Sequence, residues 1–297
     1  MSTATIRDAI ASISGTVERL SQLSQDKYSN PYTSLTWPGT IDPENVWFFS
    51  PEHVSLHGTR YWDQLDDTAQ HRLAFEEAAN FFSLNIHGEK LAIEGLATRL
   101  YRPDLAEISG YLHHFLDEEN KHSIYFGGFC QRYAKVYRSL NVPFGGKLGR
   151  EIDDLLFFAQ VMLFEEHSDW YNVHQAKDSR LDPLAVFINA AHHADESRHL
   201  VFNRAIVQAF WDTYRAGWDE ATVAGIRAQL AQFLNATWRE YYNPDVYATV
   251  GFADPWQVAE DAWASPVQRA RRRRVSAKCL RFLSKIDLLP EEPTDVF

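Results

Sequence analysis

The sequence predicts an all-α protein built around an antiparallel four-helix bundle. Between residues 68 and 214, apolar side chains recur at three- and four-residue steps, which is the spacing of one helix face. Proline and glycine divide this stretch into four segments of about 30 residues, and strand-like alternation is nearly absent. Because a short connection makes each helix return beside its predecessor, four such segments in a row indicate an antiparallel bundle.

The segments before the bundle are expected to be peripheral. Residues 2–25 have helical spacing and begin with Ser and Thr, which can cap a helix start, so they predict a helix. From about Tyr28 to Leu65, repeated prolines interrupt any regular element. This stretch should therefore be a long irregular connection.

Local signals set the ends of the four bundle helices. Thr68 is a candidate N-cap of the first helix, and Pro103 breaks the chain after it. A glycine-rich turn at 142–146 separates the second helix from the third, and Asp182-Pro183 begins the fourth. The expected helices are 68–100, 104–140, 148 to before Arg180, and 182–214.

Residues 215–297 predict two or three further helices that pack against the bundle and close its end. Asn243-Pro244 and Asp254-Pro255 mark breaks between them. No linker or low-complexity tract divides the chain. We therefore expect one domain, residues 1–297, with a core at 68–214, a peripheral segment at 1–67 and additional helices at 215–297.

Composition excludes several classes of protein. The formal net charge of -11 at pH 7 disfavours binding to nucleic acid or to an anionic membrane. No segment resembles a signal peptide or a membrane span, and Cys130 and Cys279 do not form a disulfide or zinc pattern, so a cytoplasmic protein is expected. One basic cluster, Arg269 with Arg271 to Arg274, is expected to be a solvated helix face, with a docking patch for a partner or nucleic acid as the alternative.

Two Glu-x-x-His motifs are the most informative feature of the sequence. They are Glu119 to His122 in the second expected helix and Glu196 to His199 in the fourth, and the chain contains no others. Because a three-residue step is about one helical turn, the two side chains of a motif share a face and can hold one metal ion through oxygen and nitrogen.

Each neighbouring helix offers a glutamate at a matching distance. Glu89 lies 30 residues before Glu119, and Glu165 lies 31 residues before Glu196. Two helices that give one glutamate and two that give Glu-x-x-His form the ligand pattern of di-iron and di-manganese carboxylate bundles. Four carboxylates also balance the charge of two divalent cations, which makes burial of the assembly tolerable.

Two other acidic residues compete with the lone glutamates. Glu94 lies about 140° round the helix from Glu89, so both cannot face one metal ion. Glu166 adjoins Glu165 and has the same weakness. The agreement of the two spacings favours Glu89 and Glu165.

Further polar residues lie beside the two motifs. His192 lies four residues before the motif on the same stripe, so it can reach the metal pair; a histidine paired with a carboxylate is the alternative. His193 points elsewhere. Glu118 and Asp195 each precede a motif glutamate, where they can accept a hydrogen bond from the other motif's histidine. Arg198 can pair with such a carboxylate or form an ordinary surface ion pair.

At these residues the chain resembles the ferritin-like di-iron superfamily, and most of all the p-aminobenzoate N-oxygenase family. In that family the second motif carries an extra histidine ligand four residues before its glutamate, and residues 192–199, His-His-Ala-Asp-Glu-Ser-Arg-His, reproduce that arrangement. The resemblance covers about residues 68–214. It implies a ferritin-like fold and seven ligands to two iron ions: Glu89, Glu119, His122, Glu165, His192, Glu196 and His199.

The resemblance also implies a function. Two reduced iron ions would activate dioxygen through a peroxo intermediate and oxidise the nitrogen of a small-molecule amine to a hydroxylamine, nitroso or nitro product in secondary metabolism. The implied partners are the amine, an electron donor such as a reductase or ferredoxin, and a second copy in a homodimer.

Three other interpretations of the ligand pattern exist. A radical-generating ribonucleotide reductase subunit is disfavoured because Phe126 stands where that family has a tyrosine, and Tyr125 faces about 100° away. A di-iron hydroxylase or desaturase acting on carbon uses the same metal core. An iron-storage or ferroxidase protein is disfavoured because the segments on either side of the core supply walls for a substrate pocket.

Overall fold

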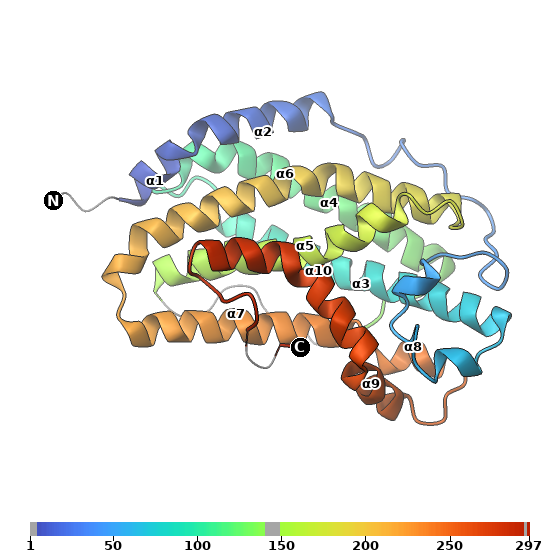
Figure 1. The fold of residues 1–297 in the computed structure, drawn as a ribbon. Helices are drawn as coiled ribbons and strands as arrows, with labels where there is room; N and C mark the ends of the chain where they lie inside the picture. The colour runs from blue at the N-terminus through green and yellow to red at the C-terminus, as the bar shows by residue number, and fades with distance from the viewer. Residues whose placement is uncertain (1–4, 140–148, 294–295) are drawn as a thin grey trace.

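The computed structural model describes residues 5–139, 149–293 and 296–297 of the chain. Helices dominate these residues, and the only strand-like feature there is an isolated bridge between Trp47 and Leu181. Four long helices form the core: α3 (Asp67–Arg99), α4 (Ser109–Tyr133), α5 (Arg150–Gln175) and α6 (Pro183–Tyr214). α3 packs along α4, and α5 packs along α6 (Figure 1). The expected all-α bundle is confirmed.

The bundle helices do not alternate strictly in direction. At the end of α3, Arg99 Nε lies 2.9 Å from Asp154 Oδ1 near the start of α5. α4 begins at that same end, where the backbone N–H of Tyr101 donates to Ser109 Oγ at 2.9 Å. α4 and α5 therefore run in the same direction, whereas α3 with α4 and α5 with α6 are antiparallel pairs (Figure 1).

The prediction of a short connection between the second and third bundle helices is wrong. α4 ends at Tyr133 and α5 begins only at Arg150; the expected turn at 142–146 lies outside the described residues. After α4, side chains of α3 hold Tyr137, whose N–H donates to Ser83 Oγ at 2.9 Å and whose hydroxyl donates to Glu76 at 2.6 Å. These tertiary contacts replace further helical hydrogen bonds.

The start of the bundle differs slightly from expectation. Asp66, and not Thr68, caps α3, because its Oδ1 accepts the N–H of Ala69 at 2.9 Å. The fourth helix begins as expected, with Asp182 accepting the N–H of Leu184 at 2.8 Å. Helix ends are thus set by which neighbouring carboxylate reaches the free N–H groups.

The N-terminal segment forms two helices instead of one. α1 (Ile6–Ser12) starts with a capping box between Thr5 and Asp8, and α2 (Ser14–Asp26) follows a break at Ile13. Ser14 and Gly15 after the break weaken a continuous helix. Both helices lie across the bundle, with α1 against α6 and α2 against α4 and α6 (Figure 1).

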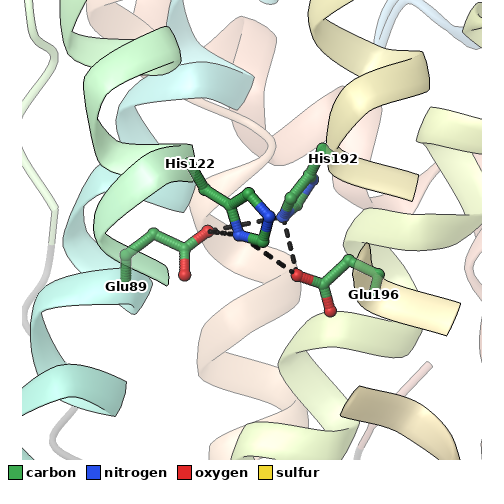
Figure 2. Close-up of side chains that lie close together, drawn as sticks. All are labelled: Glu89, His122, His192 and Glu196. Carbon is green, nitrogen blue, oxygen red and sulfur yellow. Dashed lines mark ion pairs between the residues drawn. The ribbon is translucent and has the colours of Figure 1, made fainter. Parts of the chain in front are cut away.

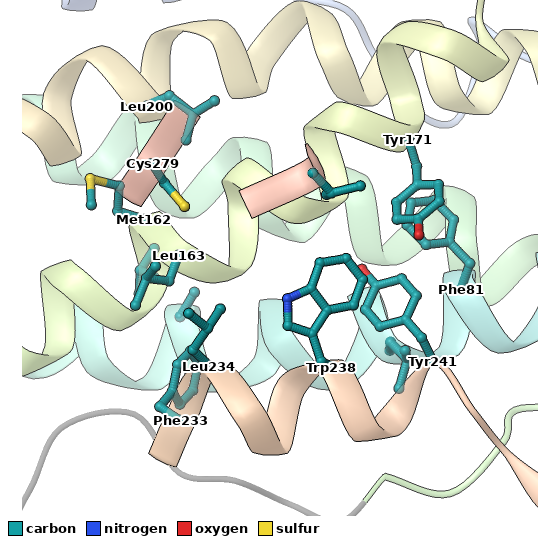
Figure 3. Packing of buried hydrophobic residues seen from close by; sticks show 14 of the residues in the cluster. Phe81, Met162, Leu163, Tyr171, Leu200, Phe233, Leu234, Trp238, Tyr241 and Cys279 are labelled. Carbon is teal, nitrogen blue, oxygen red and sulfur yellow. The ribbon is translucent and has the colours of Figure 1, made fainter. Parts of the chain in front are cut away.

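The described residues after Tyr214 contain four α-helices, whereas two or three were expected. They are α7 (Glu220–Glu240), α8 (Pro244–Ala248), α9 (Pro255–Ala264) and α10 (Pro266–Lys285). Short 3-10 turns also occur at Pro51–His53, Trp62–Gln64, Ala106–Ile108 and Arg215–Gly217. α7 and α10 both pack on α5, and Figure 3 shows Leu234 and Trp238 of α7 beside Leu163 of α5 and Cys279 of α10. They cover the outer side of the helix that carries Glu165.

The basic cluster is only partly a solvated face. Arg271 is buried and donates to three carbonyl oxygens of residues 52–54 at 2.5 to 2.9 Å. Arg272 is also buried, donates to the Tyr242 hydroxyl and the Trp263 carbonyl, and lies over the Trp263 ring. The solvated-face prediction is wrong for these two, because carbonyls and an aromatic ring take the place of water; the other three arginines are exposed.

In the described ranges, no helix combines the length and the apolar composition needed to cross a bilayer. Cys130 and Cys279 are both buried free thiols.

Candidate metal centre

The seven candidate ligands converge inside the bundle. Each of the four core helices contributes at least one of them, and none has more than 4% of its surface exposed. They are Glu89 of α3, Glu119 and His122 of α4, Glu165 of α5, and His192, Glu196 and His199 of α6. Helical spacing places them there, since the candidate ligands of each helix lie on the stripe that faces the inside of the bundle.

Their polar atoms form two groups that share one glutamate. Within each group, one oxygen or nitrogen from every residue lies within 4.8 Å of the others. The first group is Glu89, His122, His192 and Glu196, shown in Figure 2; the second is Glu119, Glu165, Glu196 and His199. Glu196 Oε1 lies 2.9 Å from His192 Nε2 and 3.4 Å from His199 Nδ1, so it stands between the groups.

The first Glu-x-x-His motif is divided between the groups, which differs from the expectation that each motif serves one metal ion. Glu119 Oε1 lies 3.0 Å from His199 Nδ1. His122 Nδ1 instead faces Glu89 at 3.8 Å and Glu196 at 3.5 Å. Three residues fall about 60° short of a full turn, so the two side chains diverge enough to reach different positions.

Seven of the atoms that face one another inside the bundle lack hydrogen bonds. These atoms are both carboxylate oxygens of Glu119 and Glu196, Oε1 of Glu165, and Nδ1 of His122 and His199. Unpaired buried polar atoms cost about 1 to 3 kcal/mol each. Burial and the nearby charge of Glu196 raise the pKa of Glu165 well above its ordinary value. Two divalent cations would satisfy these atoms and cancel the carboxylate charges, so the residues present fit a dinuclear iron or manganese site.

Each motif histidine is oriented by a carboxylate from across the bundle. His122 Nε2 lies 3.1 Å from Asp195 Oδ2, and His199 Nε2 lies 2.8 Å from Glu118 Oε2. Arg198 Nη2 donates to both of these carboxylates at 2.5 Å. These contacts turn Nδ1 of both histidines toward the ligand groups and fix the tautomer.

The surrounding layer is balanced in charge. Burial would raise the pKa of Asp195, but the hydrogen bond and charge of His122, with the charge of Lys121, hold it below its ordinary value. Lys121 Nζ lies 2.5 Å from Asp195 Oδ2. In this layer two carboxylates, Glu118 and Asp195, therefore form ion pairs with two cationic side chains, Lys121 and Arg198.

Sequence reasoning missed four polar side chains that contact the site or its surrounding layer. Each lies 2.5 to 3.0 Å from its partner: Lys121 contacts Asp195, Ser24 contacts Arg198, Asn203 contacts Glu165 and Asn172 contacts His192. Asn203 lies four residues after His199, and Asn172 lies seven after Glu165, so both follow a ligand stripe and that spacing is a usable signal. Lys121 and Ser24 have no such signal.

The residues that were judged not to be ligands are exposed or have other partners. Glu94 is exposed, and Glu166 pairs with Arg204 and Lys278. His193 Nδ1 lies 2.6 Å from Asp169 Oδ1.

The position of a radical-forming tyrosine is occupied by phenylalanine. The Phe126 ring meets the His192 ring edge-on at 4.9 Å. The neighbouring Tyr125 points away, and its hydroxyl lies 2.7 Å from Ser34 Oγ. The site therefore has a plain aromatic ring beside this histidine.

Comparisons with known proteins agree with this geometry. The sequence profile described as P-aminobenzoate N-oxygenase AurF matches residues 12–287. Two variants of an R2-like ligand-binding oxidase, solved with an aerobically reconstituted Mn/Fe cofactor, superpose with TM-scores of 0.51. They are 15% and 16% identical to the chain, and the alignments cover 93% of it and 94% of theirs. At this identity the likeness shows the fold alone, and it confirms the ferritin-like architecture. A comparison with curated proteins found no match.

Proposed function

The chain belongs to the p-aminobenzoate N-oxygenase family and is an oxidoreductase, and on this premise we propose that it is a di-iron enzyme that uses dioxygen to oxidise the nitrogen of a small-molecule amine. The observation that carries the proposal is the pair of buried ligand groups joined at Glu196. Four carboxylates and three imidazoles form a donor set suited to two iron ions.

We propose that seven residues hold the metal ions. Glu89, His122 and His192 would bind one ion, Glu119, Glu165 and His199 would bind the other, and Glu196 would lie between them. When bound, the iron ions supply electrons and dioxygen chemistry that no amino-acid side chain offers.

Aromatic rings help to exclude water from the site. The Phe115 ring stacks on the His199 ring with centroids 3.8 Å apart, and Phe126 covers the His192 ring. Both phenylalanines are fully buried. A dry site strengthens the attraction between the carboxylates and the metal ions, and it protects an oxidant from side reactions.

The proposal includes an external electron donor. Placing one oxygen atom of dioxygen on nitrogen and releasing the other as water takes two electrons and two protons from outside the amine. A reductase or ferredoxin would supply the electrons. A homodimer and a cytoplasmic location complete the proposal, on the basis of the family resemblance and the two free thiols.

The test is a single turnover with an isotopically labelled gas. The protein would be loaded anaerobically with ferrous iron, mixed with p-aminobenzoate and exposed to dioxygen labelled with a heavy oxygen isotope. Mass spectrometry of the products and their fragments would locate the label. The proposal predicts two irons per chain and label on the nitrogen. Label on carbon would instead favour a hydroxylase, and iron accumulating far beyond two per chain without product would favour storage; either result contradicts the proposal.

Two matched variants sharpen this test. Glu89→Gln removes a charged ligand and is expected to abolish iron-dependent turnover, whereas Glu94→Gln changes an exposed glutamate on the same helix and should leave turnover unchanged. Equal activity of both variants would remove Glu89 from the ligand set.

A further inference from the structure

Asn172 of α5 is a buried amide directed at one candidate ligand. Its exposed fraction is 0%, and its Nδ2 lies 2.5 Å from Nδ1 of His192. Its other polar atom, Oδ1, has no hydrogen-bond partner. The opposite nitrogen of His192, Nε2, lies 2.9 Å from Glu196 Oε1 and 3.4 Å from Glu89 Oε1 (Figure 2).

The three histidines face the ligand groups through different nitrogens. His122 and His199 present Nδ1 and place Nε2 on a carboxylate. His192 is reversed: Nε2 faces the carboxylates and Nδ1 faces Asn172. An imidazole that binds a metal ion through Nε2 carries its proton on Nδ1, and that N–H needs an acceptor.

The amide of Asn172 can provide that acceptor. A half-turn of the side-chain amide exchanges Nδ2 and Oδ1, which brings the oxygen to the position 2.5 Å from Nδ1. The oxygen, which has no partner in the present orientation, then gains one. Metal binding at Nε2 and the orientation of the Asn172 amide are therefore linked.

We propose that Asn172 is a positioning residue whose amide oxygen accepts the Nδ1 proton of His192 and holds Nε2 toward Glu89 and Glu196. The inference rests on the proposed di-iron function and concerns its third histidine. Because a carboxylate acceptor makes an imidazole a stronger donor and an amide does so much less, His192 is the weakest of the three nitrogen ligands. The two metal positions thus have equal numbers of ligands but differ in their histidines, since one has His122 and His192 and the other has His199 alone.

Charge explains why an amide occupies this position. The four ligand glutamates already balance two divalent ions, and the surrounding acids Glu118 and Asp195 are paired with Arg198 and Lys121. An aspartate at position 172 would add a buried negative charge that no described base contacts. Such a charge is costly to bury without a partner.

The test uses cobalt(II) in place of iron and proton NMR in water. Cobalt-bound histidines give strongly shifted N–H signals that disappear in heavy water, and the wild type is expected to bind two cobalt ions and show three such signals. His192→Ala should remove one signal. Asn172→Leu should remove the same signal or make its proton exchange rapidly, and should lower cobalt affinity roughly 10- to 100-fold in a chelator competition.

A rescue variant and a double variant separate positioning from general damage. Asn172→Asp keeps an acceptor at this position and should keep the third signal, even though its buried charge lowers the stability of the fold. Asn172→Leu combined with His192→Ala should bind cobalt as His192→Ala alone does, because the residue acts through the histidine. Asn80→Leu is the matched control, since Asn80 is a buried amide that donates to the carbonyl of Glu240 at 3.1 Å, away from the ligands; it should keep all three signals.

Two results would overturn the inference while leaving the proposed function intact. In one, the wild type binds two cobalt ions with three shifted signals, and Asn172→Leu keeps all three with unchanged affinity. In the other, Asn172→Leu weakens binding further in the His192→Ala background. A wild type that binds fewer than two cobalt ions would instead contradict the proposed metal centre itself.

Discussion

At the scale of single residues, helical spacing made many of the candidate ligands predictable. Glu89 and Glu165 were chosen because their distances from the two motifs agree. Residues three, four or seven positions apart on one helix share a stripe, so the motif residues and His192 could be located together without a structure. Lys121 could not, because its contact with Asp195 depends on how two helices are placed against each other. The division of Glu119 from His122 has a different origin, since it follows from the roughly 60° by which three residues fall short of a helical turn.

Glu77 gives a prediction for stability at the residue scale. It is buried away from the ligand groups, accepts the N–H of Ser55 at 3.3 Å, and also accepts the Ser55 hydroxyl. Burial raises the pKa of Glu77 from 4.5 to about 7. The folded protein thus favours the protonated form, and the stability that this form contributes is fully present below pH 4.5 and lost as the pH rises through about 7.

The expected size of this effect is about 3 kcal/mol between pH 4.5 and about pH 8. Glu77→Gln cannot ionise and should not show this loss. The free energy of urea unfolding of the wild type, minus that of Glu77→Gln, should therefore fall with rising pH. A difference that stays constant with pH would show that Glu77 is not held protonated.

At the scale of helices, α3 and α5, which carry the lone glutamates, pack closely against each other. An ideal Cβ on Gly95 would lie 2.0 Å from Cε2 of the Phe157 ring, so the two helices approach closely there. The Arg99 guanidinium lies over the Phe157 ring, 3.9 Å from the ring centroid. This contact fixes the distance between the helices that carry Glu89 and Glu165.

Gly95→Ala is predicted to destabilise the fold by about 1 to 2 kcal/mol, because overpacking outweighs the gain in helix propensity. Gly225→Ala is the matched change, since a Cβ on that glycine of α7 would meet nothing within 4 Å. It should stabilise the protein by about 0.5 to 1 kcal/mol. Urea unfolding measures both, and a stabilising Gly95→Ala would contradict the close approach.

Helix ends were less predictable than helix interiors. The sequence between Tyr133 and Leu140 continues to look helical, yet Ser83 and Glu76 of α3 draw Tyr137 out of the helix through hydrogen bonds. The N-cap of α3 is Asp66, which lies two positions before the expected Thr68. Such outcomes depend on partners that lie far away in the sequence or on small local preferences.

At the scale of the whole molecule, segments from both ends of the chain enclose the bundle. Arg271 of α10 donates to carbonyl oxygens of residues 52–54, which precede it by more than 200 positions. Ser24 of α2 accepts a hydrogen bond from Arg198 at 3.0 Å, which ties the N-terminal helix to the layer around the ligands. Composition predicted these segments only as peripheral, since long-range contacts leave no local pattern.

The Arg271 contacts predict a marked loss of stability when they are removed. Arg271→Gln deletes charge-assisted hydrogen bonds to buried carbonyls and should cost about 2 to 3 kcal/mol. Arg274→Gln changes an exposed arginine of the same helix and should shift stability by about 0.5 kcal/mol or less. Equal unfolding midpoints for the two variants would show that α10 is not anchored through Arg271.

The most direct test of the di-iron centre is a crystal structure of the anaerobically iron-loaded protein with anomalous diffraction data at the iron edge. We expect two iron peaks about 3.5 to 4 Å apart, with the Glu196 carboxylate between them. One ion should lie beside Glu89, His122 and His192, and the other beside Glu119, Glu165 and His199. A single peak, or peaks that lie outside these two groups, would show that these seven residues do not form a two-iron centre.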